Sequence, residues 1–95
     1  MSTTHIPTAL FRLGRICATS NALATLAQSD IFTGLQRHQA GDWGDVDSHD
    51  RRANERALKD GSRLFSVYHS TSRVKFWIIT EADRRMTTVL LPRDY

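Results

Sequence analysis

The apolar and β-branched residues of this chain concentrate in its last third, in three runs over residues 62–70, 73–81 and 86–92. The runs are rich in Val, Ile, Phe, Tyr, Trp and Thr, which is typical of β-strands. The connections between them are a few polar residues long, as in antiparallel hairpins. The pattern predicts a three-stranded antiparallel meander.

Pairing Tyr68 with Val74 in the first hairpin divides the meander into two faces. We expect helices on the face without cations, because burying an unpaired cation is costly. That face carries Leu64, Ser66, Tyr68, Val74, Phe76, Ile78, Val89 and Leu91. The other face carries Arg63, Phe65, Val67, Arg73, Lys75, Trp77, Ile79, Met86, Thr88 and Leu90. A register slip of one residue would exchange the faces of a strand.

Helical periodicity dominates the middle of the chain and predicts three helices, over residues 21–29, 31–39 and 51–59. The side chains able to cap their first turns are Thr19 or Ser20, Asp30, and Asp47 or Ser48. Gly61 is expected to end the third helix. The inward-facing side chains of the first two helices are expected to be Leu23, Leu26, Ala27, Ile31 and Leu35, with Phe32 as a further candidate.

A short edge strand, bent at Gly14, is expected over residues 10–18, ahead of the helices. The element order β-α-α-α-β-β-β predicts an α+β domain with an antiparallel sheet and helices packed on one face. Between the second and third helices, "GDWGD" predicts a sharp turn that folds Trp43 back against the domain as a structural clamp. An exposed Trp43 acting as a binding anchor is the alternative.

The length of 95 residues, 40% hydrophobic, fits one domain over 10–95 after a loose segment at 1–9. A single cysteine, Cys17, excludes an intramolecular disulfide, and no long apolar stretch is present, so we expect a cytoplasmic protein. No cofactor-binding motif is apparent. The net charge of +3 leaves protein and nucleic-acid partners open.

The second face of the meander is too apolar for ordinary solvent-exposed surface in so small a domain. Its aromatic residues within a cationic rim are typical of protein interfaces, and we expect one at Phe65, Val67, Arg73, Lys75, Trp77 and Ile79. The candidate occupants are the N-terminal segment, a second copy of the chain in a homodimer, or another protein.

A basic ridge of Arg52, Arg56, Lys59 and Arg63 is a possible nucleic-acid contact, although such ridges are more often solvated helix faces. His69, Glu81, Arg84 and Arg85 have the side chains of a metal-independent ribonuclease, but His69 and Glu81 are expected at opposite ends of a hairpin. His38, His49 and the nearby aspartates lack the spacing of a metal-binding loop. We therefore expect neither a metal nor catalysis.

The motifs "GDWGD", "D..AN..AL..G.RL.S.Y" and "WIITEADR..TT.LLP..Y" resemble a group of small bacterial proteins usually described as plasmid-related. The resemblance runs from "LGRICAT" to Tyr95 and departs at Arg85, where the group usually has serine. It implies a mobile genetic element as the setting and no particular chemistry. We expect a non-enzymatic protein that acts by protein–protein interaction, with inhibition of a host defence system, of the anti-CRISPR or anti-restriction kind, as a candidate role. The alternatives are a ribonuclease or toxin-like protein and a nucleic-acid-binding domain.

Overall fold

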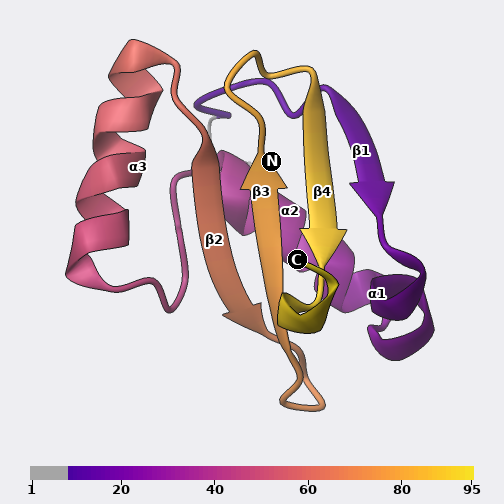
Figure 1. Ribbon diagram of the computed structural model, residues 1–95. Helices are drawn as coiled ribbons and strands as arrows, with labels where there is room; N and C mark the ends of the chain where they lie inside the picture. Colours follow the sequence, from indigo (N-terminus) through magenta and orange to yellow (C-terminus); the bar gives the residue numbers. More distant parts are fainter. Residues whose placement is uncertain (1–8) are drawn as a thin grey trace, which may run out of the picture.

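The computed structural model describes residues 9–95, which form a four-stranded sheet, three α-helices and a C-terminal 3-10 helix (Figure 1). The predicted α+β class and element order are confirmed. The loose segment predicted at 1–9 lies outside the described residues except for Ala9. In chain order the elements are β1 (Arg15–Ala18), α1 (Ser20–Thr25), α2 (Gln28–Gln39), α3 (Ser48–Asp60), β2 (Leu64–His69), β3 (Lys75–Thr80), β4 (Met86–Leu90) and η1 (Pro92–Asp94).

The strands lie in the order β1-β4-β3-β2. The meander of β2, β3 and β4 is antiparallel as predicted, but β1 pairs in parallel with β4, so the sheet is mixed and the prediction of an all-antiparallel sheet is wrong. Hairpin signals report only on strands that are close in sequence. The four residues of β1 carry no information about a partner near the other end of the chain.

The first hairpin pairs Tyr68 with Phe76 rather than with Val74. This shift of two residues preserves the faces, because side chains alternate with a period of two. Val89 lies opposite Ile78, and Phe76, Ile78 and Val89 are all buried on one face, as predicted.

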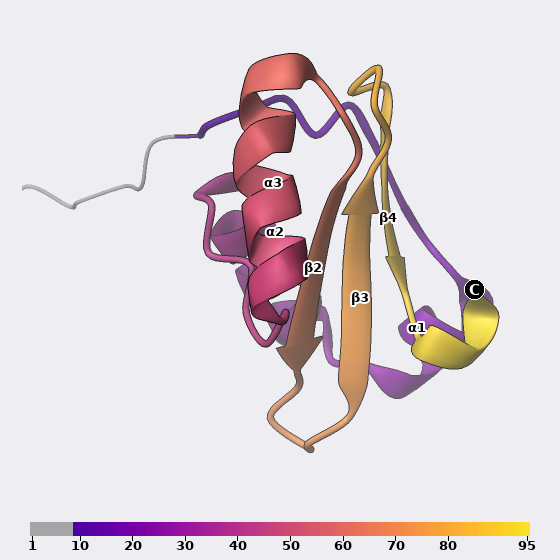
Figure 2. The ribbon, with the colours of Figure 1, turned by 60° about the vertical axis from the view of Figure 1, so that its left-hand side comes forward.

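Helices α1 and α2 pack on this face, with Ala22, Leu26 and Leu35 in the same core cluster as the strand residues (Figures 1 and 2). Gly34 lets α2 approach the sheet closely, since a Cβ there would stand 3.1 Å from the Ile78 and Phe76 side chains. The core therefore lies between one face of the sheet and two helices.

Helix α3 runs along the outer side of β2 (Figures 1 and 2). Asn54 holds it there: its Nδ2 donates to the Phe65 carbonyl at 2.7 Å, and its Oδ1 accepts from the Phe65 amide at 3.0 Å. Asp47 and Gly61 cap the helix, as predicted.

The "GDWGD" segment continues this cover of β2. The Val67 amide donates to the carbonyl of Trp43 at 3.0 Å, and the Asp45 amide donates to the carbonyl of Val67 at 2.8 Å. Trp43 is 1% exposed, so its predicted burial is confirmed, and its indole Nε1 donates to Glu55 at 3.0 Å. The outer edge of β2 is thus closed by the chain itself.

The helices differ from the prediction at three places. The first helix, predicted over residues 21–29, ends at Thr25. Helix α2 begins at Gln28 after Ala27, and Asp30 does not cap it but accepts hydrogen bonds from Thr71 of the β2–β3 turn. Leu23 and Phe32, expected to face inward, are 61% and 63% exposed. Ala27, also expected to face inward, is exposed, and Ala22 is buried in the core instead. The predicted inward positions of Leu26, Ile31 and Leu35 are confirmed.

Candidate interaction surfaces

The first candidate surface, called the Trp77 surface, comprises Phe65, Val67, Arg73, Lys75, Trp77 and Ile79. The structure places it on the sheet face opposite α1 and α2. Val67 and Ile79 are buried, whereas Phe65 and Trp77 are half-buried with their rings edge to face at 5.2 Å. The surface therefore presents an aromatic pair over a filled sheet.

The C-terminal residue covers part of this surface. The Tyr95 ring lies 5.7 Å from that of Trp77, and its hydroxyl accepts a hydrogen bond from Arg63 at 2.9 Å. A hollow of about 320 Å³ remains between the sheet, Tyr95 and the α3 residues Asp50, Ala53 and Asn54. Neither Tyr95 nor α3 was among the predicted occupants, because no sequence pattern places a chain end on a sheet face.

The rim of the Trp77 surface is cationic. Arg63, Arg73 and Lys75 are exposed, and no carboxylate of residues 9–95 lies within ion-pair distance of them. Unpaired cations beside aromatic rings suit a partner that brings carboxylates next to an apolar group.

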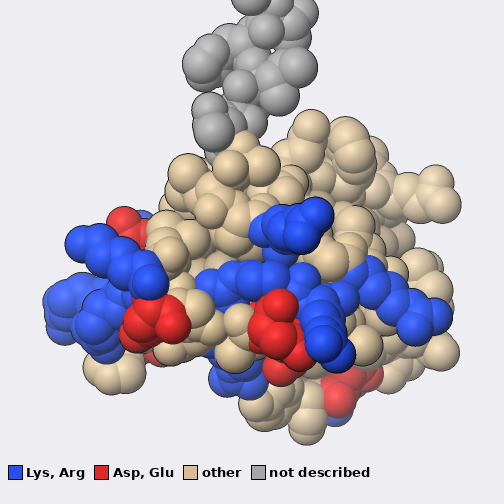
Figure 3. All heavy atoms as spheres, turned by 90° about the horizontal axis from the view of Figure 1, so that it is seen from above, with Lys and Arg blue, Asp and Glu red and all other residues tan. Residues whose placement is uncertain are grey.

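The basic ridge has exposed side chains throughout: Arg52, Arg56, Lys59 and Arg63. Figure 3 shows a wider band of Lys and Arg side chains across the end of the molecule that is uppermost in Figure 1, with acidic side chains between them. Arg84 joins the elements at this end, since its guanidinium donates to the carbonyls of Ser62 at 2.6 Å and Ala57 at 2.9 Å. Arg84 therefore has a structural role, because it links the end of α3 to the β3–β4 turn.

The ribonuclease candidates do not come together. His69 ends β2 opposite Lys75, whereas Glu81 follows Thr80, which pairs with Leu64 at the other end of the hairpin. His69 contacts Asp45 at 2.8 Å instead. The only cluster of potential metal ligands in residues 9–95 is Asp47, His49 and Asp50, with ligand atoms within 4.8 Å of one another. Asp47 accepts the Asp50 amide there as the cap of α3, which accounts for its position.

His38 belongs to neither site but to a buried chain of hydrogen bonds. Its Nδ1 lies 2.5 Å from Ser66 Oγ and its Nε2 lies 2.9 Å from Thr80 Oγ1. Thr80 Oγ1 lies 2.7 Å from Thr87 Oγ1, which donates to the Leu13 carbonyl at 2.7 Å. This chain of hydrogen bonds could not be predicted from the sequence, because its members are spread over most of the domain.

The hydroxyl protons of this chain have one consistent arrangement. Thr87 gives its proton to Leu13, so Thr80 must donate to Thr87 and accept from His38 Nε2–H. Burial, with a smaller effect from Arg84, lowers the pKa of His38 to about 3, so the imidazole is neutral. With its one proton on Nε2, the ring accepts a hydrogen bond from Ser66 at Nδ1. Within residues 9–95, every buried side-chain nitrogen and oxygen has a hydrogen-bond partner.

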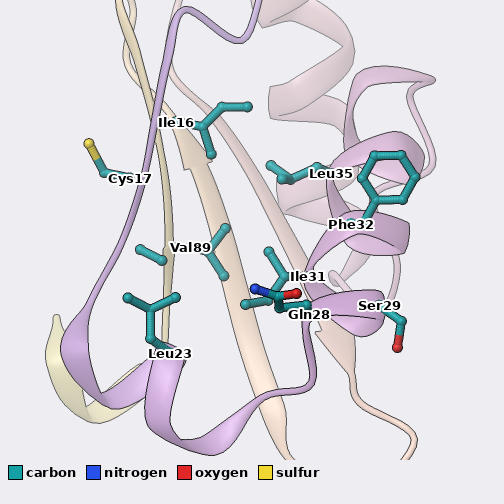
Figure 4. Close-up of a pocket in the computed structure, with 10 residues that line it drawn as sticks. Ile16, Cys17, Leu23, Gln28, Ser29, Ile31, Phe32, Leu35 and Val89 are labelled. Carbon is teal, nitrogen blue, oxygen red and sulfur yellow. The ribbon is translucent and has the colours of Figure 1, made fainter.

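A second surface lies on the helix side of the sheet, at its β1 edge (Figure 4). Ile16, Leu23 and Phe32 are 52%, 61% and 63% exposed, and they line a groove of about 720 Å³ whose floor includes Leu35 and Val89. We call it the β1 groove. Sequence reasoning missed it because Leu23 and Phe32 were assigned to the core.

Comparison of the chain with protein-family models, curated proteins and solved structures finds no match. Among the described helices, none is both long enough and apolar enough to cross a lipid bilayer.

Proposed function

We propose that this chain is a small non-enzymatic binding protein that acts by protein–protein interaction through the Trp77 surface. The observation that carries the proposal is the half-buried Phe65–Trp77 pair within a rim of cations that have no ion-pair partner among residues 9–95. Aromatic residues and arginine are the side chains enriched at the energetic centres of protein interfaces. The separation of His69 from Glu81 supports a role without catalysis.

The chemistry of the surface defines the partner as a protein that presents an apolar side chain flanked by carboxylates. The apolar group fits the hollow beside Trp77, and the carboxylates pair with Arg63, Arg73 or Lys75. The resemblance to plasmid-related proteins suggests a mobile genetic element as the setting. Inhibition of a host defence system, of the anti-restriction or anti-CRISPR type, is the role we propose there.

The test replaces Trp77 by alanine and measures affinity for a partner captured from a bacterial lysate and then purified. Loss of a central aromatic is expected to cost roughly 2 kcal/mol or more of binding free energy, which is about 30-fold in Kd. Phe32→Ala is the matched control, because Phe32 is an exposed aromatic on the other face. If Trp77→Ala binds as tightly as the parent chain while Phe32→Ala does not, the Trp77 surface is the wrong site.

Nucleic-acid binding is the second candidate, favoured by the band of cations in Figure 3. A phosphate backbone along this band would give an affinity that falls steeply with salt. The test is a titration of labelled single- and double-stranded oligonucleotides at low salt with the parent chain and with Arg56→Ala. We expect weak binding or none; binding that Arg56→Ala weakens would move the function to this end of the molecule.

A further inference from the structure

The outer edge of β1 is an open strand edge. Arg15 and Thr19 donate their amides to carbonyls of the β4 side, at 2.8 and 3.0 Å. Because peptide groups alternate in direction along a strand, the N–H and C=O groups of Ile16 and Ala18 point away from the sheet. They have no backbone partner within residues 9–95. Exposed edges of this kind readily pair with another strand.

The two edges of the sheet are therefore unequal. Trp43, Asp45 and α3 close the β2 edge, whereas the β1 edge is open and borders the β1 groove. Ile16 belongs to both features, since its backbone lies on the edge and its side chain lines the groove. A strand added at β1 would satisfy the free peptide groups and cover apolar surface at the same time.

We propose that β1 pairs antiparallel with β1 of a second copy of this chain across a two-fold axis, giving a dimer with one continuous sheet of eight strands. Ile16 of each copy lies opposite Ala18 of the other, and each such pair exchanges both hydrogen bonds. The two β1 grooves then lie on the same side of the sheet and adjoin at the axis, so that each covers the other's exposed apolar side chains.

Charge complementarity favours a second copy over an unrelated strand. In this register Arg15 of one copy lies opposite Thr19 of the other. The Thr19 hydroxyl donates to Asp94 at 2.6 Å, so each Arg15 is brought to a carboxylate. Within residues 9–95 neither Arg15 nor Asp94 has an ion-pair partner of its own chain. Because of the two-fold symmetry, the dimer contains two such pairs of Arg15 with Asp94.

The same register places Cys17 on the two-fold axis, opposite its own copy. The pair is of the non-hydrogen-bonded kind, with Cα atoms about 4.5 Å apart. Cys17 is the only cysteine of the chain and is half-buried on the sheet face opposite the groove (Figure 4). A disulfide between two chains can form only through Cys17, so the rate at which it forms measures how closely the two Cys17 thiols are held.

The experiment measures the mass of the full chain by sedimentation equilibrium under reducing conditions, over a range of micromolar concentrations. The expected result is a concentration-dependent dimer. Mild oxidation of the dimer is expected to give a disulfide-linked pair through Cys17, faster than in urea-unfolded protein at the same concentration. A monomer at every concentration, or a dimer whose Cys17 thiols do not cross-link faster than in the unfolded chain, overturns the proposal.

The control variants test the register. Arg15→Glu places like charges together twice and is expected to raise the dimer Kd by roughly tenfold or more. Arg12→Glu makes the same change of charge at an exposed residue before the strand and is expected to leave the Kd nearly unchanged. Circular dichroism checks that both variants are folded. Equal weakening by the two variants overturns the pairing of Arg15 with Asp94.

Discussion

His38 shows how a single buried side chain sets a property of the whole protein. Its imidazole is fully enclosed, contacts Phe11 and Trp43 edge to face, and has both nitrogens occupied by hydroxyls. Protonation would place a charge where no carboxylate of residues 9–95 lies within ion-pair distance. The folded protein therefore keeps His38 neutral in a pH range where the unfolded chain protonates it.

This difference predicts a loss of stability in mild acid. The pKa of His38 is about 3 in the folded state and about 6.5 in an unfolded chain, so its contribution is complete above pH 6.5 and falls as the pH drops toward 3. We expect the free energy of unfolding to fall by about 1.4 kcal/mol per pH unit below pH 6. Urea titrations between pH 7 and pH 5 measure the slope.

Two histidine variants test whether His38 causes this pH dependence of the unfolding free energy. His38→Gln is expected to flatten the dependence, because glutamine offers a donor and an acceptor but does not titrate. His49→Gln, at an exposed imidazole, is expected to retain it. A slope that persists in His38→Gln would assign the acid sensitivity to another group.

Among the elements, the turn before α3 depends on backbone that only glycine provides. Gly44 has φ of +73°, and a Cβ built on it would overlap the Val67 carbonyl oxygen. That oxygen accepts the Asp45 amide, so the overlap falls on the contact that closes the β2 edge. Gly61, which ends α3, has a similar φ of +80° but nothing within 4 Å of its Cβ position.

The two glycines give a matched pair of substitutions. Gly61→Ala is expected to cost about 1–2 kcal/mol of unfolding free energy, the cost of left-handed backbone in a residue with a Cβ. Gly44→Ala is expected to cost at least about 2 kcal/mol more, because the segment must also leave β2. Chemical denaturation of the two variants compares them directly. Similar losses of unfolding free energy in the two variants would show that the contact of Gly44 with Val67 does not contribute to stability.

Elements with local signals could be predicted from the sequence, and elements fixed by distant contacts could not. Both caps of α3 and the faces of the meander follow from side-chain types and a period of two. The start of α2 and the exposure of Phe32 escaped prediction because tertiary packing selected Ile31 and Leu35 for the core. Phe65 and Trp77 lie on the sheet face away from α1 and α2, as predicted, but their cover by Tyr95 depends on a contact between segments far apart in sequence.

At the scale of the whole molecule, the last residues of the chain are joined to the segment that links β1 to α1. Asp94 accepts hydrogen bonds from Thr19 and Asn21, each at 2.6 Å, so η1 holds the start of α1. Strands β3 and β4 lie between other strands, whereas β1 has a partner on one side only. Stability is therefore expected to fall from the centre of the sheet to its β1 side.

Native-state hydrogen exchange tests this gradient. Amides of β3 are expected to exchange only on global unfolding, because β3 is paired on both sides and packs against α2. Amides of α1 are expected to exchange through openings of much lower free energy, since a helix of six residues is not stable by itself. Equal protection of the two elements would show that the domain opens as one unit.

The buried hydrogen-bond chain also bears on how faithfully the sheet assembles. Ser66, Thr80 and Thr87 come from three strands, His38 from α2 and the Leu13 carbonyl from the segment before β1. Apolar side chains tolerate a sliding partner, but a strand displaced by one or two residues would leave hydroxyls and an imidazole buried without partners. The chain of hydrogen bonds therefore favours one register of β2, β3 and β4, because a misaligned sheet would lose free energy when it buried these groups without partners.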